Sequence, residues 1–256
     1  MITYEEYENL VIKHDQLLKE SQNIMISYTR EFGELIAELF EKKMSCIEKK
    51  KSISFCQALV NQNKKIDINA LNAHLDQEMQ KYKDEYKQLV SNVENSKNAK
   101  PASEHAVQKS KALYRKLAKM IHPDINAKLY EDEEDTFFPN IWLEIMAAYS
   151  NNDPVRLSEL EVLVVKELKD REIDVEEPEI EDIDFKAEEL KRDIDRIETT
   201  DPYLYKFLLD DYEAVEEKKN SLKDEIKEYS EYEQELQKIL AQIMMSNGVT
   251  VEWEKI

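Results

Sequence analysis

Residues 114–126, with the sequence YRKLAKMIHPDIN, hold the side chains whose types and spacing could bind a partner or do chemistry. Between residues 105 and 122 there are five basic side chains and no acidic one, although the whole chain has a formal charge of −20. On a helix, Arg115, Lys116 and Lys119 share one face. This basic face favours an acidic partner, either the acidic segment of this chain or another protein.

The basic helix is predicted to end at His122-Pro123-Asp124. Proline disfavours helical geometry in the residue before it, so His122 should begin a loop in which Asp124 can cap backbone donors. An ordinary helix-ending loop would explain the same three residues. No second His, Cys or paired acid lies at a useful spacing, so we identify no catalytic residue, no metal ligand and no cofactor site.

The composition predicts which class of fold positions this segment. The chain has only two glycines and six prolines, with 36% charged and 41% apolar residues. The turns of β-sheets and phosphate-binding loops commonly require glycine, which this chain almost lacks. Long amphipathic helices and an all-α fold are therefore expected. The excess of 56 acidic over 36 basic residues argues against a general nucleic-acid or membrane-surface binder. With no signal peptide, no apolar run of membrane-spanning length and no disulfide or zinc pattern around its two cysteines, a cytoplasmic location is predicted.

The hydrophobic pattern divides the chain. Apolar side chains at alternating three- and four-residue steps predict two helices joined by a turn at 61–67, with Asp67 as a cap and Gly33 as a weak point. A similar pattern near the C-terminus predicts a second hairpin, with Asp201-Pro202 starting its long helix. The predicted segments are an N-terminal hairpin (1–98), a compact helical module (103–170), an acidic linker (171–184), a C-terminal hairpin (185–246) and a tail (247–256). Three such long stripes predict an elongated molecule, and coiled-coil homodimerisation is one way to bury them.

The module resembles the J-domain co-chaperones of DnaK-type chaperones. In that family a basic helix with a Tyr-basic-basic-Leu-Ala pattern, here residues 114–118, runs into a His-Pro-Asp loop. A helix with an aromatic residue, an Ile three later and Ala-Tyr after it then packs back, which matches residues 142–149. The resemblance covers about residues 105–165. It implies a core of six side chains: Tyr114, Leu117, Ile121, Trp142, Ile145 and Tyr149.

The resemblance also implies a function. The partner-binding residues would be His122, Pro123, Asp124, Arg115, Lys116, Lys119 and Asn126, and the partner a DnaK-type ATPase whose ATP hydrolysis the module stimulates. The hairpins would position the module or bind a client or an assembly. The architecture looks like the bacterial J-domain-containing proteins with flanking coiled coils.

Two departures from the family favour a second hypothesis. The family's first helix is not recognisable, so its place must be taken by residues 103–112 or by the end of the N-terminal hairpin. Met120 and Ile125 replace residues that are commonly basic beside the loop. The alternative is therefore a coiled-coil scaffold with a degenerate, non-stimulating module. Solvent exposure of His122 and of the basic helix face distinguishes the two hypotheses. If they are exposed, the co-chaperone is favoured. If another part of the chain covers them, the scaffold is favoured.

Overall fold

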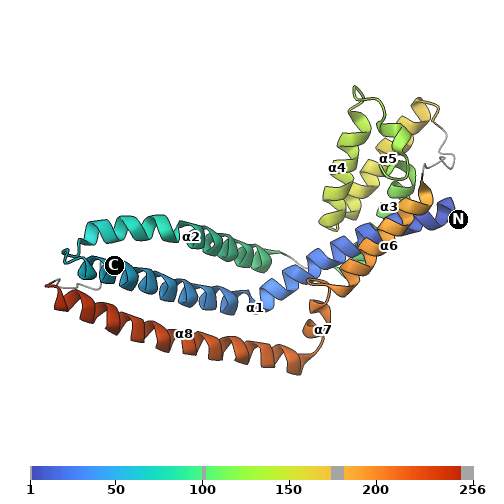
Figure 1. Cartoon of the computed structure of the whole chain (residues 1–256). Helices are drawn as coiled ribbons and strands as arrows, with labels where there is room; N and C mark the ends of the chain where they lie inside the picture. Colours follow the sequence, from blue (N-terminus) through green and yellow to red (C-terminus); the bar gives the residue numbers. More distant parts are fainter. Residues whose placement is uncertain (1, 100–101, 174–181, 249–256) are drawn as a thin grey trace. The chain divides into compact units, whose positions relative to one another are not determined.

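The computed structural model describes residues 2–99, 102–173 and 182–248. Within these ranges 84% of the residues are helical and none lies in a strand, which confirms the all-α class. The elements, labelled in Figure 1, are α1 (Tyr4–Asn61), α2 (Ile68–Asn98), α3 (Glu104–Ile121), the 3-10 helix η1 (Ala127–Tyr130), α4 (Phe137–Ser150), α5 (Pro154–Asp170), α6 (Ile183–Thr199), α7 (Tyr205–Leu209) and α8 (Tyr212–Ser246).

These helices form two compact units, each built from two separate stretches of the chain. The first unit comprises residues 1–25 and 100–204, and the second comprises residues 26–99 and 205–256. The predicted boundary near residues 95–103 coincides with one of these divisions. The division between residues 25 and 26 was not predicted, because it lies inside the uninterrupted helix α1 and carries no turn signal.

The second unit contains only residues 26–98 of the predicted N-terminal hairpin (1–98), and there α2 runs antiparallel to residues 26–61 of α1. Phe40 stacks on Tyr86 with ring centroids 6.2 Å apart, and Lys51 pairs with Glu78 at 2.6 Å. The turn at 61–67 is confirmed. Asp67 caps α2 as predicted, since its carboxylate accepts hydrogen bonds from the backbone N–H groups of the second and third helical residues, at 2.9 and 3.4 Å.

The predicted C-terminal hairpin is not the pairing that the structure shows, because α6 belongs to the first unit and α8 to the second. Helix α8 instead lies along residues 26–61 of α1 and runs parallel to them, on the side away from α2 in Figure 1. Lys43 pairs with Glu225 at 3.2 Å, and Lys49 pairs with Glu233 at 3.0 Å. The apolar stripe of α8 is therefore buried against α1. Near the end of α8, the same stripe joins a cluster that also contains residues of α2.

The predicted start of the long C-terminal helix at Asp201-Pro202 is wrong. Residues 201–204 form a turn, in which Tyr203 is buried against Leu17 and Ile194. Helix α8 begins at Tyr212, after Asp211, whose carboxylate accepts backbone N–H groups at 2.9 and 3.2 Å. Its predicted end near residues 247–248 is confirmed. Most of the predicted acidic linker (174–181) and tail (249–256) lies outside the described residues.

Gly33 permits a close approach between α1 and α2 rather than marking a weak point. A Cβ atom at this position would lie 2.7 Å from a methyl group of Val93. We therefore expect Gly33→Ala to lower the free energy of unfolding by about 1–3 kcal/mol through overpacking. Urea denaturation followed by circular dichroism measures this cost.

The control for this prediction is the same substitution in a Val93→Ala background. Removing the two methyl groups of Val93 removes the clash, while alanine remains the better helix former by about 1 kcal/mol. Gly33→Ala should then be neutral or stabilising. An equal loss of stability in both backgrounds would show that α1 and α2 do not cross closely at Gly33.

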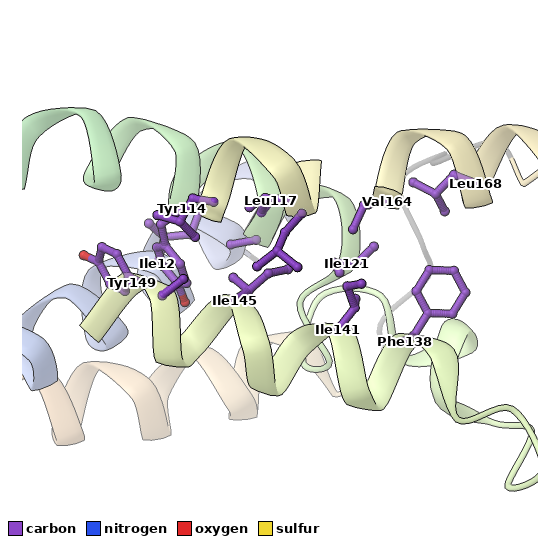
Figure 2. Packing of buried hydrophobic residues seen from close by; sticks show 14 residues of the cluster. Ile12, Tyr114, Leu117, Ile121, Phe138, Ile141, Ile145, Tyr149, Val164 and Leu168 are labelled. Atoms are coloured by element: carbon purple, nitrogen blue, oxygen red, sulfur yellow. The ribbon is translucent and has the colours of Figure 1, made fainter. Parts of the chain in front are cut away.

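In the first unit α3 packs on α4 and α5, and their shared core is shown in Figure 2. Its fully buried side chains include Tyr114, Leu117, Ile121 and Ile145, all predicted core positions. Residue Ile12 of α1 enters the same cluster. Helix α6 packs on the first turns of α1 through two smaller clusters centred on Ala187 and Ile194.

Candidate functional site

The two helices of the predicted module pair as expected. Helix α3 begins after Ser103, whose hydroxyl caps it, and ends at Ile121 with His122 as its C-cap. All six predicted core side chains belong to one cluster with Leu113. Tyr114 stacks on Tyr149 with ring centroids 4.0 Å apart. Trp142 is only half-buried, and its ring lies 4.7 Å from that of His122, edge to face.

The additional helix that packs on this pair is the start of α1. Ile12 lies in the α3–α4–α5 core, and polar side chains of the same turns of α1 bind α3. The sequence analysis had expected residues 103–112 or the end of the N-terminal hairpin to take this role, and neither of them does. Residues 103–112 instead form the first turns of α3 itself.

The His-Pro-Asp turn is held by hydrogen bonds of its own backbone and side chains. The N–H of Asp124 donates to Nδ1 of His122 at 3.0 Å. The carbonyl oxygen of His122 accepts the N–H of Ile125 at 3.0 Å and that of Asn126 at 2.7 Å. The side-chain amide of Asn126 donates to the carbonyl oxygen of Lys119 at 3.1 Å. This turn is therefore a fixed structure that leaves the Asp124 side chain exposed.

His122 itself is buried, with 6% of its surface exposed. For this residue the structure therefore shows the covered state that the sequence analysis associated with the scaffold. Its Nε2 lies 3.0 Å from Oδ2 of Asp15 in α1, and its ring packs against Trp142. The physical reason is that α1 covers the turn with a carboxylate that completes the hydrogen bonds of the imidazole.

Asp15 is the residue of this candidate site that the sequence reasoning missed. Besides His122, it accepts the hydroxyl of Tyr114 and lies 3.5 Å from Nδ1 of His14. Burial acts to raise the pKa of the Asp15 carboxyl, but the hydrogen bonds from His122, His14 and Tyr114 outweigh it and hold that pKa below its usual value. Burial, with the adjacent Asp15 charge, raises the pKa of the Tyr114 hydroxyl. The carboxylate therefore stays ionised and the phenol neutral at neutral pH.

Three basic side chains of α3 have acidic or polar partners within the first unit. Arg115 donates to Gln16 at 3.3 Å, Lys119 pairs with Glu8, and Lys116 pairs with Glu161 of α5. In the part of the chain that the structure describes, these partners come from α1 and α5. The side chains of Lys116 and Lys119 nevertheless remain 60% and 50% exposed, whereas those of their partners Glu161 and Glu8 are only 20% and 8% exposed.

Two apolar residues beside the turn, Met120 and Ile125, are used in packing. Ile125 is 1% exposed and lies in a cluster with Tyr7 and Val11 of α1 and Ala187 of α6. Met120 is half-buried against the core of the module. The apolar side chain of Ile125 therefore serves the contact of the turn with α1 and α6.

Lys19 is a buried cation at the other end of the α3–α4 pair. Its ammonium lies 3.6 Å from the centroid of the Tyr149 ring and donates to the side-chain oxygen of Asn152 at 2.6 Å. Burial, together with the nearby charge of Lys111, lowers the pKa of this ammonium to about 8. These contacts tie α1 to the end of α4.

The described ranges hold no group of three His, Cys, Asp or Glu side chains that could bind a metal ion. None of the helices in these ranges has the length and apolar character that crossing a membrane requires. In comparisons with known proteins, no family model, no curated protein and no solved structure matches this chain.

Proposed function

We propose that this protein is a J-type co-chaperone that docks a DnaK-type ATPase and promotes its ATP hydrolysis. The observation that carries the proposal is the exposed carboxylate of Asp124 on a hydrogen-bonded turn at the end of a basic helix. A fixed turn presents a charged group without a large ordering cost. The exposed ammonium groups of Lys116 and Lys119 would attract an acidic surface of the partner.

In this mechanism the chain catalyses nothing itself. It would shift the partner toward hydrolysis by binding one conformation of that ATPase more tightly than another. The exposed parts of Lys119 and Lys116 would attract acidic groups of the partner, while both lysines keep their pairs with the more buried Glu8 and Glu161. The second unit would position the module or bind a client. Two buried free thiols, Cys46 and Cys56, fit a reducing compartment such as the cytoplasm.

The test is the ATPase rate of the cognate DnaK with the full chain and with Asp124→Asn. We expect the parent to raise the rate and Asp124→Asn to abolish the increase, because the variant loses the exposed charge. Its stability should change by less than about 0.5 kcal/mol, since the side chain is exposed. Glu133→Gln, which neutralises another exposed acid of the same unit, is the matched control and should retain full stimulation.

The contact between His122 and Asp15 favours a second candidate function. A covered His122 is the feature expected of a scaffold in which the module serves only for packing. In that case the full chain would neither bind DnaK nor change its ATPase rate at any concentration tested. Stimulation that disappears in Asp124→Asn would instead exclude the scaffold as the whole function.

A further inference from the structure

The hydrogen bonds around His122 fix which of its two ring nitrogens carries the proton. A backbone N–H can only donate, so the contact from the Asp124 N–H at 3.0 Å requires Nδ1 to be an unprotonated acceptor. The other nitrogen, Nε2, faces the ionised carboxylate of Asp15 at 3.0 Å and must therefore be the donor. The imidazole is accordingly held as the neutral Nε2–H tautomer.

We propose that Asp15 is a positioning residue for the His-Pro-Asp turn: it binds the Nε2 proton of His122, so that Nδ1 holds the Asp124 N–H and the exposed Asp124 carboxylate has one fixed direction. The inference rests on the proposed function for its effect on a partner, but the tautomer itself can be measured independently of any partner. Asp15 never needs to touch the ATPase to have this effect.

The position of Asp15 supports this role. The carboxylate is largely buried, and a buried charge is costly unless hydrogen bonds compensate it. Three side chains compensate it here, and two of them, Tyr114 and His122, come from α3 and its C-cap. Tyr114 lies two turns before His122, so Asp15 binds both ends of the segment that leads into the turn. The Asp15 contact therefore orients the ring as well as setting its protonation.

The first measurement is nitrogen-15 NMR of the imidazole groups in the full chain, with His122 assigned by comparison with His122→Gln. We expect the parent to show the Nε2–H tautomer. In Asp15→Asn the amide can donate to Nε2, so the tautomer should change or become mixed. Exchange of the Asp124 amide proton should then accelerate by about tenfold, because its acceptor is lost.

The second measurement is DnaK ATPase stimulation by the same proteins. Asp15→Asn should lose about tenfold, which corresponds to about 1.4 kcal/mol, the scale of one hydrogen bond lost from the turn. Asp15→Glu should restore the tautomer and part of the stimulation. His14→Ala is the matched control, because it removes another partner of Asp15 but leaves His122 bound. It should keep the tautomer and remain within about twofold of the parent.

The outcomes separate the inference from the proposed function. An Nδ1–H tautomer in the parent, or an Asp15→Asn variant with unchanged tautomer and amide exchange, would overturn the positioning role. An Asp15→Asn variant that changes the tautomer yet stimulates fully would overturn the effect on presentation of Asp124. A parent with the expected tautomer, fast amide exchange only in Asp15→Asn and no stimulation of DnaK would support positioning and refute the co-chaperone function.

Discussion

Tyr114→Ala should lower the free energy of unfolding of the first unit by about 3–5 kcal/mol, the range for deleting a large buried aromatic side chain. The ring is fully buried, it stacks on Tyr149, and its hydroxyl is one of the donors that compensate the buried Asp15 carboxylate. The substitution therefore opens a cavity and removes a hydrogen bond to a charge at the same time. Urea titration monitored by circular dichroism measures the loss.

Trp142→Ala is the control on the facing helix. Trp142 is also aromatic and also contacts Tyr114, but it is half-buried, so less apolar surface returns to water on truncation. We expect a cost of about 2 kcal/mol, below the value for a fully buried ring. If Trp142→Ala were as damaging as Tyr114→Ala, the core of the module would be centred on α4 rather than on the contact between α3 and α1.

His122→Ala should lower the same free energy by about 2–3 kcal/mol, although the residue lies in a turn. The variant leaves the buried Asp15 carboxylate with one donor fewer and deprives the Asp124 N–H of its acceptor, and each unsatisfied buried group costs about 1–3 kcal/mol. A fall in melting temperature relative to the parent would show this cost directly.

Asp124→Ala is the control within the same turn. Its carboxylate is exposed, so the expected change in stability is within about 0.5 kcal/mol. The two residues of the turn thus differ in their predicted effect on stability, because the side chain of His122 is buried and that of Asp124 is exposed. Equal stability of both variants with the parent would contradict the bond between His122 and Asp15.

Local signals predicted most of the secondary structure. The turn at 61–67, the cap at Asp67 and the end of α3 before Pro123 depend on residues within a few positions of one another. Leu117 and Ile121 were predictable as core residues in the same way, because a step of four residues places them on one helix face. The other core positions of the module followed from the family resemblance and not from periodicity.

Features that depend on distant residues could not be predicted in this way. Asp15 and His122 are 107 positions apart, and nothing local marks Asp15 as the partner of a turn. The start of α8 shows a related difficulty, since Asp201 and Asp211 are both reasonable caps. The burial of Tyr203 against α1 and α6 holds the first of them in a turn, and this contact becomes visible only when the tertiary packing is known.

The division of α1 between the two units has a consequence for the order of synthesis. Residues 1–25 leave the ribosome first, but the helices they cover belong to residues 100–204. At about 5–20 residues per second, these early turns wait for several seconds before their partners emerge, while residues 26–99 can already form a hairpin. A fragment limited to residues 103–170 would likewise lack Ile12 and Asp15, and would expose His122 that the intact chain keeps covered.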